Sequence, residues 1–146
     1  MNTDDRSAGM LSMRTRLSTM WIFIMLNMLF ADVLSFMYPG YLKAAMTGYA
    51  GAVQITPGFL LGAALVTEIP IAMIVLSRVL KHGANRWANI VAGVVTIAYV
   101  VGGGPLNYLH YIFFAVMEVG CAVLIIRYAW TWREPHASIV PVAAER

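Results

Sequence analysis

Two glutamates and one aspartate stand inside long apolar runs of the sequence. Glu68 lies in LVTEIPIAMIVL, Glu118 in FAVMEVGCAVL and Asp32 in MLFADVLSFM. An ionised carboxylate is costly in a medium of low dielectric, and neighbouring like charges raise that cost further. Three such acids therefore predict either protonated carboxyl groups or a site that holds a proton, a metal ion or a ligand amine.

Pro70 follows Glu68 by two residues in the same apolar run. A proline inside a helix removes one backbone donor and displaces the carbonyl four residues earlier, here that of Val66. The sequence thus predicts a kink with an unpaired acceptor beside Glu68. A broken helix next to an intramembrane acid is typical of binding sites near the bilayer midplane.

The composition indicates a membrane protein. Of the 146 residues, 60% are hydrophobic and 12% charged, whereas about half of a soluble domain is apolar and about a quarter charged. Four runs, at 17–38, 57–80, 87–103 and 108–130, can each cross a hydrocarbon core of about 30 Å. We therefore expect an all-α fold, an integral membrane antiparallel four-helix bundle over 17–132. A cytoplasmic segment at 1–16 precedes it, and a disordered cytoplasmic tail at 133–146 follows.

The basic residues predict the orientation of the bundle. Of the ten lysines and arginines, only Lys43 falls on one side of the proposed spans, and basic residues next to a span resist translocation. Both termini are therefore expected to be cytoplasmic. The basic residues flank apolar runs and form no patch interleaved with exposed aromatics, so no nucleic-acid partner is expected. The expected partner is the lipid bilayer.

Helical spacing places the acids at related depths. At 1.5 Å per residue, Glu68 and Glu118 lie about 15 Å below the outer surface and Asp32 about 9 Å. The spacing of Ala64, Glu68 and Ala72 in the second span predicts one inward stripe. Phe114, Glu118 and Ala122 predict another in the fourth span. We therefore expect both glutamates to point into one shared interior.

Further polar residues complete the set of ligand-binding or proton-coupling candidates. The set is Glu68, Glu118, Asp32, Asn27, Tyr99 and His110, with Pro70 as the kink. The alternative for the two glutamates is that they are protonated structural acids bonding across helices to Asn27, Thr96 or Tyr99. Asp32 could instead reach hydrated headgroups, Asn27 could join two helices, and His110 could be an interfacial histidine.

Other chemistries find little support in the sequence. The histidines fall at different depths, so one chain offers no bis-histidine pair for a haem. We find no calcium loop, no HxxxH spacing, no G-x-S-x-G motif and no phosphate loop in its strand-to-helix context, so no metal site and no catalytic residue are predicted. The first outer loop contains YLKAAMTGYA, which predicts a short surface helix or a re-entrant cap.

Several motifs resemble those of the DoxX-like group of small bacterial four-helix membrane proteins. They are RWANIVAG in the third span, the glutamate of FAVMEVGCAVLIIRYAW with its tryptophan-rich exit, and TEIP in the second span. The resemblance covers most of 17–132. It implies a multi-pass protein of the bacterial inner (plasma) membrane, and the group's named member is associated with a quinone-linked oxidoreductase complex.

The leading hypothesis is a binding protein whose cleft holds a small amphipathic, cationic or quinone-like ligand. No cofactor is required, although a quinone or a lipid would suit such a cleft. The chain could act alone, as a homodimer or as a subunit of a membrane complex. A dimeric proton-coupled transporter, a membrane-embedded isomerase and a redox-associated subunit are the alternatives, with enzymatic activity disfavoured.

Overall fold

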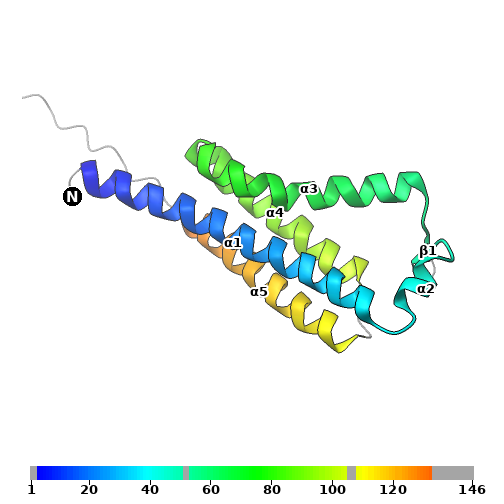
Figure 1. Cartoon of the computed structure of the whole chain (residues 1–146). Helices are drawn as coiled ribbons and strands as arrows, with labels where there is room; N and C mark the ends of the chain where they lie inside the picture. The colour runs from blue at the N-terminus through cyan, green and yellow to red at the C-terminus, as the bar shows by residue number, and fades with distance from the viewer. Residues whose placement is uncertain (1–2, 51–52, 105–107, 133–146) are drawn as a thin grey trace, which may run out of the picture.

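The computed structural model describes residues 3–50, 53–104 and 108–132, and most of them are helical (Figure 1). The elements are α1 (Thr3–Met37), α2 (Tyr41–Ala45), β1 (Tyr49–Ala50), β2 (Val53–Gln54), α3 (Pro57–Val79), α4 (His82–Gly103) and α5 (Leu109–Thr131). In the described part of the chain, α1, α3, α4 and α5 are long and apolar enough to cross a membrane. The predicted helical fold with four such segments is confirmed.

The first helix is longer than its apolar run. The prediction started the first span at residue 17, whereas α1 begins at Thr3 and its apolar membrane-length part is Leu11–Met37. Hydropathy marks where a helix can enter lipid, and a polar extension of the same helix leaves no such signal. The tail at 133–146, for which disorder was expected, lies outside the described residues.

The four long helices pack in a ring. α1 contacts α3 and α5, and α4 contacts the same two helices. We call the end of the bundle where α3 passes into α4, at Leu80 and Lys81, the turn end. The opposite end, where α2 and the two short strands lie, is the loop end (Figure 1).

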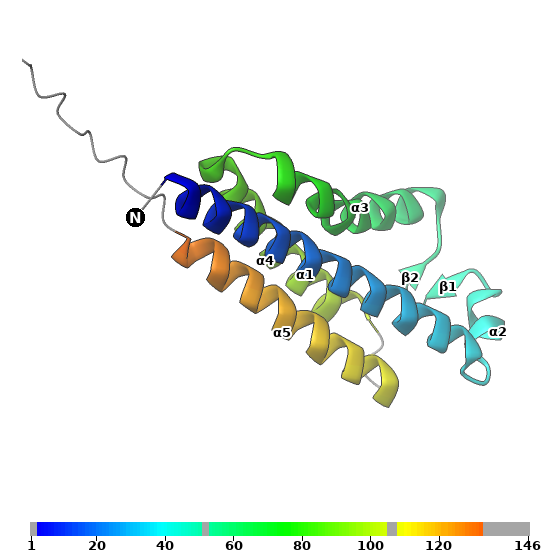
Figure 2. The same ribbon diagram turned by 60° about the vertical axis from the view of Figure 1, so that its left-hand side comes forward.

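α3 departs from the bundle over its first half. In Figure 2 the helices α1, α4 and α5 run alongside one another, while α3 bends away toward the loop end. The buried residues of α3 are Pro70, Met73 and Ser77, all in its second half. A proline cannot donate the backbone bond that holds a helix straight, so Pro70 accounts for a bend between the two halves.

The loop end carries its own local signals. Thr56 caps α3 by accepting a hydrogen bond from the Phe59 amide at 3.1 Å, and Pro57 occupies the first helical position, where its missing N–H is not needed. The short helix predicted within YLKAAMTGYA is present as α2. β1 and β2, which pair antiparallel, were not predicted.

Four buried polar side chains join three helices near the turn end. The indole of Trp21 donates to Asn89 Oδ1 at 2.7 Å, and Ser77 Oγ donates to the same oxygen at 3.2 Å. Asn89 Nδ2 donates to Asn85 Oδ1 at 2.6 Å, and Asn85 Nδ2 donates to the Ser77 carbonyl at 2.6 Å. We call Trp21, Ser77, Asn85 and Asn89 the turn-end network. Because all four are fully buried, these bonds replace those that water would make.

Candidate ligand-binding cavity

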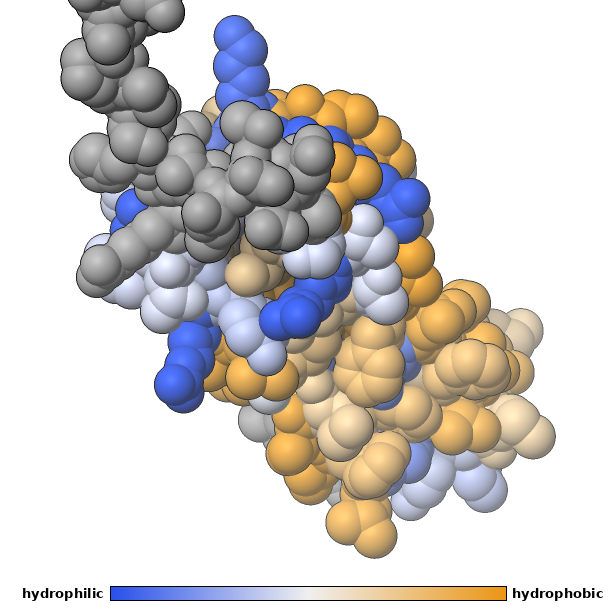
Figure 3. Space-filling view, turned by 90° about the vertical axis from the view of Figure 1, so that its left-hand side faces the viewer, coloured by the Kyte–Doolittle hydropathy of each residue, from blue (hydrophilic) through white to orange (hydrophobic). Residues whose placement is uncertain are grey.

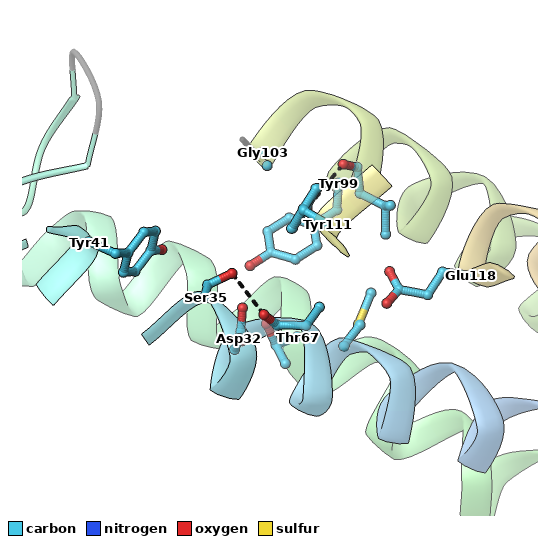
Figure 4. Close-up of a pocket in the computed structure, with 12 residues that line it drawn as sticks. Asp32, Ser35, Tyr41, Thr67, Tyr99, Gly103, Tyr111 and Glu118 are labelled. Atoms are coloured by element: carbon cyan, nitrogen blue, oxygen red, sulfur yellow. Dashed lines mark hydrogen bonds between the residues drawn. The ribbon is translucent and has the colours of Figure 1, made fainter. Parts of the chain in front are cut away.

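A cavity of about 140 Å³ lies between the helices in the loop-end half of the bundle (Figure 4). Figure 4 shows Asp32, Ser35 and Thr67 on one side of it, Tyr99 and Tyr111 opposite them, and Glu118 and Tyr41 toward its two ends. Its full lining is Met28, Ala31, Asp32, Ser35, Tyr41, Thr67, Tyr99, Val100, Gly103, Gly104, Tyr111 and Glu118. Every long helix therefore contributes to its wall.

Glu118 is the buried acid of the cavity. Its side chain is 3% exposed, and its carboxylate points into the space between the helices (Figure 4). Oε1 is buried and has no hydrogen-bond partner among the described residues. The inward stripe predicted for the last span is correct at Glu118 and at Ala122, which is also fully buried. A buried carboxyl oxygen without a partner is costly, so this oxygen is poised to accept a hydrogen bond.

The α1 wall carries a second acid and a hydroxyl. Asp32 lines the cavity but remains partly exposed at the surface of the chain. Ser35, one turn away and 3% exposed, donates to the Ala31 carbonyl at 2.8 Å. Tyr41 of α2 lies near this wall, where burial raises the pKa of its hydroxyl and Asp32 raises it further. Tyr41 therefore keeps its proton and remains a hydrogen-bond donor near the mouth.

Two tyrosines form the opposite wall. Tyr111 donates to the Val100 carbonyl at 3.3 Å, which ties α5 to α4. The phenol of Tyr111 occupies the space where a side chain on Gly104 would lie, so glycine is required at that position. Tyr99 is 37% exposed and also lines the cavity. The wall offers aromatic faces and hydroxyl groups to whatever the cavity holds.

Glu68 does not belong to the cavity, and the prediction that it shares an interior with Glu118 is wrong. Its side chain is exposed, and the neighbouring Thr67 takes the place in the lining. The residues that α3 turns inward are spaced by three and four and include Thr67, Pro70 and Ser77. Glu68 is rotated by about 100° from that stripe. The prediction placed Glu68 on the inward face of α3, whereas the structure places the neighbouring Thr67 there.

Asn27 and His110 are also outside the lining. Asn27 Nδ2 donates to the Phe23 carbonyl of its own helix at 2.8 Å, so it does not join two helices. His110 Nε2 lies 3.2 Å from Ser35 Oγ, and its ring stacks on that of Tyr108 with an interplanar angle of 12°. His110 thus supports the wall from behind through Ser35.

The cavity combines two carboxyl groups with three tyrosines, which suits a small organic cation or a neutral molecule with donor groups. Within residues 3–50, 53–104 and 108–132, no three histidine, cysteine or acidic side chains lie close enough together to hold a metal ion. The expected cluster of three acids does not form. Sequence analysis did not select Thr67, Tyr41 or Tyr111 as site residues. Pro70, three residues after Thr67, is the one signal that could have identified the inward face of α3.

Comparison with known proteins places the chain in a family. No curated protein and no solved structure matches it. A family model described as "Family of unknown function (DUF6326)" matches residues 11–138. This match gives no support to the resemblance to the DoxX-like group, which stays a prediction. Because the matched segment spans most of the chain, the chain belongs to this family of unknown function.

Proposed function

We propose that this protein binds a small organic cation in the cavity at its loop end. In this proposal the chain is an antiparallel bundle in the bacterial inner membrane with both termini cytoplasmic. The basic side chains at the turn end support that orientation, since such residues stay on the cytoplasmic side. The cavity would then open toward the outer half of the bilayer.

The observation that carries the proposal is the unpartnered carboxyl oxygen of Glu118. It is buried, faces the cavity and shares that space with Asp32, Tyr99 and Tyr111. A bound ammonium group would supply the missing hydrogen bond and the counter-charge, and tyrosine faces attract cations. The cavity of about 140 Å³ is smaller than the roughly 300–1,000 Å³ of sites for drug-sized molecules, so the ligand is small.

A quinone head group is the competing ligand class, and its hydrogen bonding differs. Quinone oxygens only accept hydrogen bonds, so a quinone would use the hydroxyl groups of the tyrosines and a protonated Glu118. Glutamine at position 118 keeps a donor but cannot carry a negative charge. Glu118→Gln should therefore preserve quinone binding and abolish cation binding.

The test measures how far probe ligands raise the unfolding temperature of the purified chain in mild detergent. The probes are butylammonium and tetramethylammonium chloride against sodium chloride at equal ionic strength, with a short-chain ubiquinone as the neutral probe. Glu68→Gln is the matched control, because it removes an acid from the same depth outside the cavity. We expect the wild type and Glu68→Gln to be stabilised by a cation and Glu118→Gln not to be. Full cation stabilisation of Glu118→Gln would refute the proposal.

A dimeric proton-coupled transporter is the second candidate, and the exposure of Glu68 favours it. Glu68 lies in the middle of an apolar membrane-length helix, with its side chain on the surface of the chain. An acid facing lipid is costly, and a second copy packed against α3 would cover it. Flux of a cation into liposomes, driven by a pH gradient, would support transport. Glu68→Gln should then stop the flux while leaving cation stabilisation intact, and absence of flux in the wild type would leave binding alone.

A further inference from the structure

Among the described side chains, those at the turn end carry positive charge and no negative charge. The cationic ones are Arg14, Arg16, Arg78, Lys81, Arg86 and Arg127, and Figure 3 shows hydrophilic side chains grouped at this end of the apolar bundle. The acids whose side chains are described, Asp32, Glu68 and Glu118, lie farther along the helices. Among the described residues, no ion pair neutralises these cations.

Two of these arginines converge where α1 meets α3. Arg78 Nε donates to Ser18 Oγ at 2.9 Å, and Ser18 in turn donates to the Ile74 carbonyl at 2.7 Å. Arg14, one turn before Ser18 on the same face of α1, directs Nη1 to the Arg78 carbonyl at 3.4 Å. These contacts place both guanidinium groups at one junction of α1 and α3. Ser18 binds Nε of Arg78, which leaves the terminal nitrogens of that guanidinium available.

Aromatic residues indicate the depth of this junction in the bilayer. The Arg86 guanidinium lies 5.3 Å from the ring centroid of Trp130, and the ring of Trp87 meets that of Trp130 edge to face at 6.4 Å. Tryptophans gather at the level of lipid headgroups. Arg16 lies over the ring of Tyr128 at 5.5 Å in the same region. In a bilayer, these arginines would therefore lie at the level of phospholipid phosphates.

We infer that Arg14 and Arg78 form a binding site for the phosphate of an anionic phospholipid. The planar guanidinium group matches the oxygens of a phosphate with two parallel hydrogen bonds. One phosphate between two guanidinium groups would relieve their repulsion and supply acceptors for their free donors. Clusters of basic residues between membrane helices are a known setting for anionic headgroups. The site is independent of the cavity at the other end of the bundle.

The test measures the affinity of phosphatidylglycerol for the full chain in detergent, by thermal stabilisation and by native mass spectrometry. Phosphatidylcholine with the same acyl chains is the neutral comparison. We expect phosphatidylglycerol to bind more tightly and to raise the unfolding temperature more. Arg14→Gln and Arg78→Gln should each weaken its binding about fivefold, the effect of one basic charge near an anionic surface.

Two further variants make the result specific. Lys43→Gln removes one charge at the loop end and should leave phosphatidylglycerol binding unchanged. Arg78→Lys keeps the positive charge but loses the two parallel hydrogen bonds of a guanidinium group, so it should bind phosphatidylglycerol more weakly than the wild type. It should also remain folded if Arg78→Gln does not fold. Equal losses in Lys43→Gln and Arg78→Gln would show diffuse attraction and overturn the site. Equal binding of the two lipids, or equal stabilisation by inorganic phosphate, would overturn the assignment of an anionic lipid.

Discussion

In the turn-end network, buried polar side chains from three helices bond to one another, whereas in the loop-end half two buried oxygens have no described hydrogen-bond partner. The turn-end network closes on Asn89, whose amide both donates and accepts. In the loop-end half, Glu118 Oε1 and Thr96 Oγ1 are buried without hydrogen-bond partners among the described residues. At the turn end, outside the network, the same is true of Nε of Arg14 and Nε of Arg86. Satisfied polar networks rigidify a core, while unsatisfied buried groups are a feature of functional sites. The turn-end network thus holds the helices together, whereas the two buried oxygens of the loop-end half are left open to hydrogen bonding.

Pro70 stands at the boundary between the two halves of α3. The half after it packs through Met73 and Ser77, and the half before it has no buried residue. A straight helix would continue the close packing of the turn end along α4. The bend instead moves the first half of α3 away from α4, as Figure 2 shows, and makes room beside Thr67 at the cavity wall.

Removal of the central amide of the turn-end network should have the largest effect on stability. Asn89→Ala would leave the Trp21 indole and the Ser77 hydroxyl without their shared acceptor, and both side chains are fully buried. Unsatisfied buried donors cost enough that we expect a loss of about 3 kcal/mol in the free energy of unfolding. Denaturation in detergent would measure it.

Asn27→Ala is the matched control for that variant, because the Asn27 amide bonds only within its own helix. It should change the free energy of unfolding by no more than about 0.5 kcal/mol. Similar losses in the two variants would show that the turn-end network contributes no more to stability than a hydrogen bond within one helix.

Gly104→Ala, which adds a methyl group at the loop end, should lower the free energy of unfolding by less than Asn89→Ala does. The added Cβ would collide with the phenol of Tyr111, which would have to leave its bond to the Val100 carbonyl. Overpacking of this kind costs about 2 kcal/mol, and the displaced ring should also reduce cation binding. Gly102→Ala, where a Cβ meets open space, should instead stabilise the helix by about 0.5 kcal/mol. If both variants bind cations like the wild type, the Tyr111 wall is not part of the site.

The four spans could be predicted from the sequence because each needs about 20 consecutive apolar residues. Such a run is visible in a short window of the sequence, without any knowledge of the tertiary structure. Sequence analysis also found which face of α5 points inward, since Glu118 and Ala122 are both buried. The prediction failed in α3, where nearly every face of the helix is apolar. The distribution of hydrophobic residues therefore does not show which face of α3 points inward. The sequence predicts that Glu68, the single acid of α3, points inward, whereas its side chain is exposed in the structure.

The turn-end network could not be predicted from spacing along one helix. Trp21 and Asn89 are 68 positions apart, and their pairing depends on how α1 and α4 are rotated against each other. The indole of Trp21 is fully buried, because the amide of Asn89 gives its N–H a partner away from water.

The two smallest predicted effects on stability have opposite signs. One variant in the loop-end half should be stabilised, and one in the turn-end network should be destabilised. Thr96→Val replaces a buried hydroxyl without a described partner by a methyl group of similar size, so it should raise the free energy of unfolding by up to about 1 kcal/mol. Ser77→Ala removes a hydroxyl that donates to Asn89 and should lower that free energy by about 1 kcal/mol. Both changes are to be measured without added ligand, so that the two free energies refer to the same state of the protein. A destabilised Thr96→Val would mean that this hydroxyl is already bonded in the ligand-free protein, and the contrast with the turn-end network would then rest on Glu118 alone.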